Sequence, residues 1–404
     1  MELEITTQIL LWSFALAFVL GAVANKTNFC TMGAVSDLVN MGDTNRLKAW
    51  FLAIAVALLG VTLIEGIMGY ASIDPSLPPY RSEQFSWLRY IVGGILFGIG
   101  MTFASGCGNK TLVRIGGGNI KSIFVLIVAG FFAYLMTKTD FYAVLFHPWV
   151  SATTINLKTA IGVNSQDLGG IFGGLAGMSD VSSVRTALGL LIGAIMLFFI
   201  FRSADFRSNS DNVVSGIIIG IIIVLAWAVT GGSMGDEWKE AVDFMDEVPV
   251  GVMTQSYTFI NPMGDTFAWA MNPTNTLLIS FGVMALLGVI AGSLVFSLLS
   301  KTFRIEWFND LKDFFTHMIG AVLMGIGGVL GMGCTIGQGI TGFSTLALGS
   351  MLVFVSIVFG SALTMKIQFY KMVYEEEASF MKSLITSLVD MKLLPASMRK
   401  LDAV

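Results

Sequence analysis

The sequence carries few charged residues and very few histidines. Only 12% of its 404 residues are Asp, Glu, Lys or Arg, whereas 55% are hydrophobic. Soluble domains carry about twice this share of charged residues, so the composition excludes a chain of soluble domains. His147 and His317 are the two histidines, too few for a histidine-based metal site. We expect neither a metal ion nor another cofactor, and no nucleic-acid partner.

Cysteine is equally scarce. Cys30, Cys107 and Cys334 are the only three, and two of them end apolar runs in glycine-rich contexts. This odd number in such contexts argues against a disulfide framework. The sequence also lacks a nucleotide-binding motif, so coupling to ATP within this chain is not expected. We therefore predict a protein that is not an enzyme.

Long apolar runs are abundant, and the mean hydropathy is +0.78. A run of 18–20 apolar residues spans a hydrocarbon core of about 30 Å. The first run is preceded by Glu2 and Glu4 and by no Lys or Arg, so we expect it to be retained rather than cleaved as a signal peptide. The sequence predicts an all-α polytopic protein of the lipid bilayer, with nine spans at 7–25, 49–72, 88–106, 119–137, 185–202, 213–231, 275–299, 314–332 and 340–366.

The distribution of basic residues predicts the orientation of these spans. If the N-terminus lies outside, seventeen of the 23 Lys and Arg residues fall on the inner side and six on the outer side. Cytoplasmic loops carry the excess of Lys and Arg in membrane proteins. We therefore predict a bacterial inner-membrane protein with its N-terminus outside and its C-terminus in the cytoplasm, and with outer loops at 138–184 and 232–274.

Two glycine-rich blocks repeat at a fixed distance. Residues 98–107 read GIGMTFASGC and residues 325–334 read GIGGVLGMGC, an offset of 227, with five of ten positions identical. Each block is followed by a segment rich in glycine and polar residues, at 106–119 and at 331–342. Such segments are tolerated at membrane depth only inside protein or along a cavity. Matching interruptions in two halves indicate a transport site.

The repeat predicts one transmembrane transporter domain over residues 1–366, with a first half at about 1–184 and a second half at about 185–366. An odd number of spans separates the equivalent positions, so we expect the two halves to be inverted and pseudo-symmetric. Residues 367–404 are expected to form a cytoplasmic amphipathic tail. An alternative reading is that the glycines only allow helices to pack closely.

The three cysteines are the candidate site. In apolar surroundings a thiol stays a neutral, weak hydrogen-bond donor and acceptor. A sulfur-containing anion, a soft cation such as Cu(I) bound with Met32, Met101 and Met332, or electron transfer to a quinone would each suit soft sulfur ligands. Residues beside the cysteines that support a path or attract an anion are Asn28, Thr31, Asn109, Lys110, Arg114, Thr335 and Gln338. Glu65 is a further candidate because it is ionisable and lies within a predicted span.

The blocks NFCTMGA, SGCGNKTLVR and GMGCTIGQG resemble the YeeE/YedE family of membrane transporters for sulfur-containing ions, whose best-understood members take up thiosulfate. The family character extends over most of residues 10–366. The resemblance implies nine transmembrane helices plus short re-entrant helices in an hourglass-like arrangement. It also implies that the ion passes along Cys30, Cys107 and Cys334 through S–H hydrogen bonds, without covalent exchange.

The same resemblance implies a partner and leaves the cargo open. Members of this family often work beside a small cytoplasmic sulfurtransferase of the TusA type, which would receive the cargo. Some relatives are associated with selenium, so the motif is compatible with thiosulfate, sulfide, sulfite or a selenium analogue. Uptake of a sulfur anion, most simply thiosulfate, is the main hypothesis, and transport of Cu(I) by Cys and Met is the alternative from another chemical class.

Overall fold

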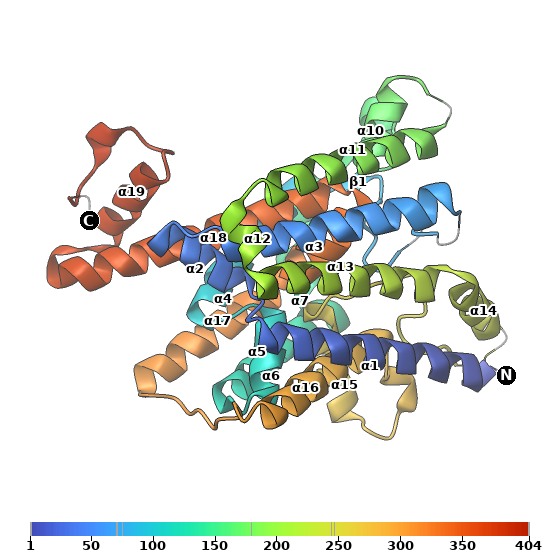
Figure 1. Ribbon diagram of the computed structural model, residues 1–404, viewed down its shortest axis with the longest axis horizontal. Helices are drawn as coiled ribbons and strands as arrows, with labels where there is room; N and C mark the ends of the chain where they lie inside the picture. Colours follow the sequence, from blue (N-terminus) through green and yellow to red (C-terminus); the bar gives the residue numbers. More distant parts are fainter. Residues whose placement is uncertain are drawn as a thin grey trace.

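The computed structural model describes residues 2–69, 72–74, 76–178, 180–243, 245 and 247–402. Most of these residues are helical (Figure 1). Within them, nine stretches are long and apolar enough to cross a membrane, which confirms the predicted all-α polytopic architecture. The long helices of these stretches are α1 (Glu2–Lys26), α3 (Asn45–Thr62), α4 (Trp87–Phe103), α6 (Ile120–Lys138), α11 (Val181–Phe201), α13 (Ser210–Gly231), α16 (Phe281–Leu299), α17 (Leu311–Leu330) and α18 (Leu348–Tyr374).

Eight of the nine predicted spans start within six residues of the observed helix, and the ninth is displaced. We predicted a span at 340–366, whereas α18 begins at Leu348 and continues to Tyr374. The displacement arises because residues 335–345 form a separate helical segment, made of a first turn, the π-helix η3 (Gly337–Gly342) and the 3₁₀ turn η4 (Phe343–Thr345). We call residues 335–345 the Cys334 segment, after the residue that precedes it.

Several short helices lie between the long ones. Two of them occupy the glycine-rich or polar stretches that follow a cysteine: α2 (Thr31–Met41) and α5 (Gly108–Gly116). The remaining short elements are η1 (Leu63–Ile67), α7 (Phe141–Leu145), α8 (His147–Thr153), α9 (Leu157–Ile161), α10 (Leu168–Leu175), α12 (Ala204–Ser208), α14 (Ser233–Val242), α15 (Ile260–Met271) and η2 (Thr276–Leu278). The strands β1 (Gln84–Phe85) and β2 (Ile155–Asn156) pair antiparallel, with Gln84 opposite Asn156.

The two stretches that were predicted to be outer loops contain more helix than expected. Residues 138–184 contain α7 to α10, and residues 232–274 contain α14 and α15. In the second stretch, the acidic residues lie mostly in its first part, at 236–247. Beyond it, Tyr257, Phe259 and Ile260 are buried, and α15 packs between α6, α16 and α17. The expectation of a plain outer loop at 232–274 was therefore wrong, because its second part enters the helix bundle.

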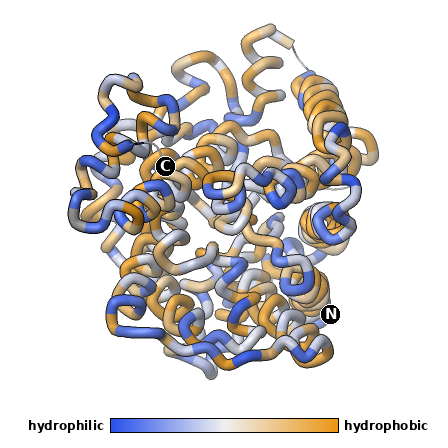
Figure 2. Tube along the Cα trace, turned by 60° about the vertical axis from the view of Figure 1, so that its left-hand side comes forward, coloured by the Kyte–Doolittle hydropathy of each residue, from blue (hydrophilic) through white to orange (hydrophobic). Residues whose placement is uncertain are grey.

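The long helices pack against one another in a small number of extensive pairs. Helix α1 packs against α16, and α13 packs against α3; α4 packs against α17 and α18, and α6 packs against α17. Figure 2 shows hydrophobic residues along the long helices and hydrophilic residues gathered in the connections. This distribution is the one expected of a protein whose helix surfaces face lipid or one another.

Glycines allow the closest of these contacts. A Cβ on Gly98 of α4 would lie 2.2 Å from the carbonyl oxygen of Ile357 in α18, and a Cβ on Gly325 of α17 would lie 2.6 Å from that of Ala129 in α6. Both glycines are helical, so here the packing interpretation of glycine is correct. The helices stop later in each block, at 104–107 and at 331–334.

The C-terminal residues form a small helical unit at the end of α18. It contains η5 (Glu375–Glu377), α19 (Phe380–Asp390) and η6 (Ala396–Met398). Asp390 accepts a hydrogen bond from Tyr370 of α18 at 2.7 Å and is paired with Arg399. Since α18 continues to Tyr374, the first residues of the stretch predicted as a tail, 367–374, belong to a helix that begins in the bundle.

Candidate functional site

The chain makes the same turn before each of the three cysteines. Two residues ahead of each cysteine stands a non-glycine residue with left-handed backbone: Asn28 (φ 52°), Ser105 (φ 58°) and Met332 (φ 57°). The following residue then donates its N–H to a carbonyl five residues back, in the pairs Phe29–Ala24 (3.2 Å), Gly106–Met101 (2.9 Å) and Gly333–Gly328 (2.8 Å). These bonds and the left-handed residue define a Schellman motif, which ends a helix.

Each cysteine then begins a new helix. Cys30 is the N-cap of α2 and Cys107 is the N-cap of α5, both with extended backbone. The carbonyl of Cys334 accepts the N–H of Gln338 at 2.8 Å, so the Cys334 segment starts at this residue. The first N–H groups of a helix lack partners within the helix, so each thiol stands beside such donors and the positive end of a helix dipole. The sulfur of Cys30 accepts one of them, the N–H of Gly33, at 3.5 Å.

The helix that begins after Gly232 differs from these three, because it has no thiol and no left-handed residue stands just before it in the described chain. Gly232 stands between α13 and α14 as an N-cap with extended backbone. This agrees with the absence of cysteine from the TGGSM sequence at 230–234.

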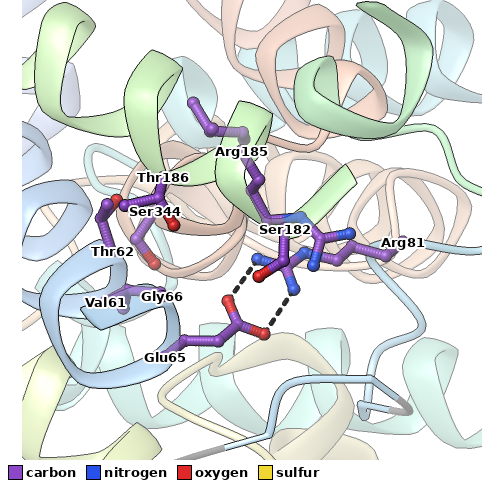
Figure 3. A pocket seen from close by; sticks show the side chains of 10 residues that line it. Val61, Thr62, Glu65, Gly66, Arg81, Ser182, Arg185, Thr186 and Ser344 are labelled. Atoms are coloured by element: carbon purple, nitrogen blue, oxygen red, sulfur yellow. Dashed lines mark hydrogen bonds and ion pairs between the residues drawn. The ribbon is translucent and has the colours of Figure 1, made fainter. Parts of the chain in front are cut away.

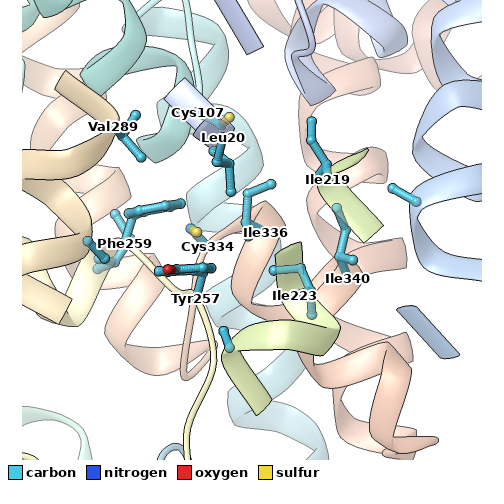
Figure 4. Close-up of a cluster of buried hydrophobic side chains, with 14 of the residues drawn as sticks. Leu20, Cys107, Ile219, Ile223, Tyr257, Phe259, Val289, Cys334, Ile336 and Ile340 are labelled. Carbon is cyan, nitrogen blue, oxygen red and sulfur yellow. The ribbon is translucent and has the colours of Figure 1, made fainter. Parts of the chain in front are cut away.

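The structure brings the three cysteines together. The thiols of Cys30 and Cys107 lie close enough to interact, and the Thr335 side chain lies near the Cys107 thiol. A Cβ on Gly108, next to Cys107, would lie 3.6 Å from the Cβ of Cys334. Figure 4 shows Cys107 and Cys334 in one cluster of buried side chains. The cysteines therefore form a row: Cys30, Cys107, then Cys334.

The row is closed to solvent in this structure. Cys107 and Cys334 are 0% exposed and Cys30 is 5% exposed. Backbone N–H groups of Phe259, Ile336 and Gly337 point at the sulfur of Cys334. With these donors the sulfur is held in a polar niche inside an otherwise apolar cluster.

Buried polar atoms without a hydrogen-bond partner surround the thiols. Four residues predicted to support the path carry such atoms: Thr31, Asn109, Thr335 and Gln338, each at most 2% exposed. Both polar atoms of the Asn109 amide lack a partner. An unsatisfied buried polar group costs about 1–3 kcal/mol, so a cluster of them requires an explanation. A polar ligand that enters this site would supply the missing partners.

A cavity of about 560 Å³ lies at the Cys30 end of the row. It is lined by Lys26, Asn28, Arg46 and other polar residues. Lys110 donates a hydrogen bond from Nζ to the Asn28 Oδ1 at 3.1 Å, and Arg114 donates to the carbonyl of Ser105 at 2.8 Å. The side chains of Asn28, Lys110 and Arg114 thus tie the turns before Cys30 and Cys107 to α5. The cavity lining itself carries both signs of charge, from Lys26, Arg46, Asp37, Asp43 and Asp211.

A second cavity, of about 170 Å³, lies toward the Cys334 end. Thr258 and Asn261 line it, and Lys138 and Asp265, an ion pair with an N–O distance of 3.1 Å, stand on its wall. The Thr258 side chain also faces the thiol of Cys334. Both Thr258 and Asn261 carry a buried side-chain oxygen without a partner.

Sequence reasoning missed this second cavity. Thr258 and Phe259 lie in the stretch predicted to be an outer loop, so they were not considered as neighbours of a cysteine. The signal in the sequence is the stretch SYTFINPMG at 256–264, which follows the acidic residues and mixes apolar residues with Thr and Asn.

The three methionines have different surroundings, although Met101 belongs to the same buried cluster as Cys107 and Cys334. Met101 is buried in the main core, Met32 packs beside a cluster formed by Val35, Ala362 and Met365, and Met332 lines a small cavity with Gln338. Glu65 forms an ion pair with Arg81 at the end of α3. In the described residues, no group of three or more His, Cys, Asp or Glu side chains is arranged to hold a metal ion.

Comparison with known proteins places the chain in a family. The chain is 25% identical over 341 residues to the thiosulfate transporter TsuA of Escherichia coli. The aligned residues cover 80% of this chain and 84% of that protein. It is 22% identical over 368 residues to the thiosulfate transporter TsuA of Spirochaeta thermophila, covering 87% and 97%. The model of a family described as "Sulphur transport" matches residues 26–363. With the family matched over most of the chain, the protein belongs to this sulphur transport family.

Proposed function

We propose that the protein is a multi-pass transporter that takes up thiosulfate or a closely related sulfur anion and passes it along Cys334, Cys107 and Cys30. The observation that carries the proposal is the row of thiols at three helix beginnings, flanked by buried polar atoms without partners. Family membership and the names of the two relatives support the choice of cargo.

The path begins at the cavity lined by Thr258 and Asn261. An anion there accepts a hydrogen bond from the Thr258 hydroxyl and then from the Cys334 thiol. Thr335 and Asn109 offer further donors on the way to Cys107. Cys30 follows, and the cavity beside Asn28 and Lys110 is the exit. Each step exchanges one weak donor for the next, and transport requires binding that is favourable enough to enter and weak enough to leave.

Helix ends supply the rest of the attraction. The N-termini of α2 (11 residues) and α5 (nine residues) direct backbone N–H groups toward the row. Such termini stabilise anions by their free N–H groups and by the helix dipole. A neutral thiol does not hold the anion as an ion pair would, so the cargo is not trapped in the membrane.

The proposal also includes the two inverted halves of the chain, its orientation in the membrane and a partner protein. Residues 1–366 form one transport domain made of two inverted halves, about 1–184 and 185–366, and the recurring helix pairs α1–α16 and α13–α3 support this division. The protein lies in the bacterial inner membrane with its N-terminus outside and the tail, predicted at 367–404, in the cytoplasm. A small sulfurtransferase of the TusA type receives the cargo at the cavity beside Asn28.

Uptake by purified protein tests the proposed cargo. We expect proteoliposomes that contain this chain to accumulate labelled thiosulfate, and sulfite, sulfide or a selenium analogue to compete according to their similarity to it. Empty liposomes provide the control. Failure to accumulate any anion of this panel contradicts the proposed function.

Thr335→Val is expected to reduce uptake without reducing thermal stability. The hydroxyl of Thr335 is buried without a partner, so its removal leaves thermal stability unchanged or slightly raised. It also removes a donor to the anion, worth about 1.5–3 kcal/mol, so uptake falls by a factor of about 10 to 100. Uptake in liposomes and the thermal midpoint of the same preparation are the two measurements.

Thr341→Val is the matched control. Thr341 is equally buried in the Cys334 segment, but its hydroxyl donates to the carbonyl of Tyr257 at 2.7 Å. We expect this change to lower the thermal midpoint and to affect uptake less than Thr335→Val. The opposite ranking of the two variants contradicts the assigned role of Thr335.

Lys110→Gln is expected to raise the KM for uptake several-fold with little change in the maximal rate. Lys110 lies at the inner mouth and raises the local concentration of anions there, an effect that salt screens. The experiment loads vesicles so that the anion enters from the Lys110 side, at low and high ionic strength. Lys121→Gln is the control, because Lys121 is neutralised by Asp313 at 2.7 Å. An unchanged KM at low salt contradicts this role.

A further inference from the structure

Two neighbouring residues of the loop before α4 hold the Cys334 segment at its two ends. The Tyr80 hydroxyl donates to the carbonyl of Gly337 at 2.7 Å, in the first turn after Cys334. The Arg81 Nε donates to the carbonyl of Thr345 at 3.2 Å, at the last residue of the segment. Tyr80 is 2% exposed, so this loop residue reaches into the core of the bundle. We call Tyr80 and Arg81 the clamp.

Arg81 is anchored by a buried ion pair. Its two terminal nitrogens donate to the two carboxylate oxygens of Glu65 at 2.6 and 2.7 Å, as Figure 3 shows. The side chains of Arg81 and Glu65 are 4% and 16% exposed. Glu65 belongs to η1, the π-helical end of α3, a type of distortion that often marks functional positions. The clamp therefore connects the end of α3 to the segment that follows Cys334.

The anchor remains charged and has further charged neighbours. Burial alone would lower the pKa of Arg81, but the hydrogen bonds and the charge of Glu65 outweigh it and raise this pKa above its ordinary value. Asp74 lies 3.4 Å from both Arg81 and Arg185, and Arg185 pairs with Asp167 at 2.9 Å. The guanidinium of Arg81 is thus fixed from several sides and gives the clamp a rigid base.

The equivalent helix of the first half is held differently. Helix α5, which follows Cys107, is fixed by hydroxyl groups of the long helix α16: Ser293 donates to the carbonyl of Val113 at 2.6 Å and Ser297 to that of Gly116 at 3.0 Å. A long helix inside the bundle is a stiff support. The Cys334 segment also packs against α3 and α18, but hydrogen bonds to its backbone at both ends come from a loop, and loops rearrange more easily than packed helices.

We propose that Tyr80 and Arg81 are positioning residues that keep the Cys334 segment in the place where Cys334 is sealed, and that release of this clamp opens the row of thiols to the loop side of the protein. The inference rests on the proposed function for the role of Cys334. It goes beyond that function in naming the loop that gates access. It requires no contact between the clamp and the anion.

Labelling of the Cys334 thiol tests the clamp without transport. A variant that carries Cys30→Ser and Cys107→Ser leaves Cys334 as the single thiol, and the purified protein in detergent is treated with a water-soluble maleimide. We expect slow labelling in this background, because Cys334 is 0% exposed. Adding Tyr80→Phe or Arg81→Gln is expected to raise the labelling rate by a factor of about ten, since each change removes one of the two bonds that hold the segment.

Tyr257→Phe is the matched control. Tyr257 is also a buried tyrosine near Cys334, and its hydroxyl donates to a backbone carbonyl at 2.8 Å, but that carbonyl belongs to Ser13 of α1. We expect its labelling rate to stay within twofold of the background. Arg81→Lys keeps the charge but loses the paired bonds to Glu65, and it should give a rate between those of the background and Arg81→Gln.

The outcomes separate this inference from the proposed function. Unchanged labelling in folded Tyr80→Phe and Arg81→Lys proteins overturns the clamp, even if thiosulfate uptake depends on Cys334 as proposed. Faster labelling in these variants supports the clamp, even if the protein carries an anion other than thiosulfate. If Arg81→Gln does not fold, Tyr80→Phe and Arg81→Lys decide the question. An equal increase in the Tyr257→Phe control also overturns it, because any lost buried hydroxyl would then suffice.

Discussion

Replacing Cys107 or Cys334 by alanine is expected to lower the rate of thiosulfate uptake by a factor of about 10 to 100 while the protein stays folded. Each thiol is placed to donate a hydrogen bond to the passing anion, and a hydrogen bond to a charged group contributes about 1.5–3 kcal/mol. Both side chains are fully buried at the start of a helix, so no nearby water replaces the lost donor. Uptake of labelled thiosulfate into proteoliposomes measures the effect.

Serine variants and thermal stability provide the controls. Cys107→Ser retains a donor of similar size, so its uptake is expected to lie between that of the parent protein and Cys107→Ala. Cys30→Ala should also lower uptake, because Cys30 contacts Cys107 in the row. A fall in uptake that only follows a fall in the thermal midpoint would indicate a damaged fold. Full uptake by the folded alanine variants of both Cys107 and Cys334 would contradict the mechanism.

The second large effect concerns stability. Gly98→Val is expected to lower the thermal midpoint strongly or to prevent folding, because even a Cβ at this position would lie 2.2 Å from the carbonyl oxygen of Ile357. The contact is with backbone, so α4 must move away from α18. Added groups in a well-packed interior cost about 1–3 kcal/mol, and occasionally more. Thermal denaturation in detergent, read by the loss of monodisperse protein, measures the change.

Gly117→Ala tests whether the effect is specific to the helix crossing. Gly117 lies at the end of α5, close to the site, but a Cβ there would lie 3.4 Å from its nearest neighbour, an ordinary contact. We expect this variant to keep its thermal midpoint within a few degrees of the parent protein. Equal tolerance of Gly98→Val and Gly117→Ala would show that α4 and α18 do not approach as described.

The long helices and the helix breaks beside Cys107 and Cys334 could be predicted from the sequence because their signals are local, although the last span was misplaced by eight residues. Nine apolar runs correspond to the nine stretches in the described residues, and the duplicated block ending in Cys107 and Cys334 marks both helix breaks. The supporting residues Thr31, Asn109, Thr335 and Gln338 follow the same blocks, and they carry buried polar atoms without partners. Their roles in transport stay predictions until uptake is measured.

The cause of the helix breaks was less evident from the sequence. Two of the three helix breaks lie in glycine-rich blocks, yet the left-handed residues are Asn28, Ser105 and Met332. A left-handed residue other than glycine is uncommon, and composition gives no sign that Ser or Met would adopt it. The glycines Gly98 and Gly325 serve close packing instead, because their neighbours are backbone atoms of other helices.

Contacts between distant parts of the chain were beyond sequence reasoning. Thr258 lies near Cys334 although 76 positions separate them in the sequence. Tyr80 is hydrogen-bonded to Gly337, which is 257 positions away. Neither pair leaves a periodic or compositional pattern, because each depends on how the bundle closes. The stretch 256–264 and the loop that holds Tyr80 and Arg81 were therefore recognised only from the structure. Glu65 was noted as an ionisable residue within a span, but its partner was not.

The most direct test of the central claim is a structure of the protein determined with thiosulfate bound. The account predicts density for the anion in the row of thiols, within hydrogen-bond distance of Cys107 or Cys334 and next to at least one of the unpartnered groups of Asn109 and Thr335. The anion bound only at a position away from all three cysteines, with the row still closed and its polar atoms still unpaired, would contradict it.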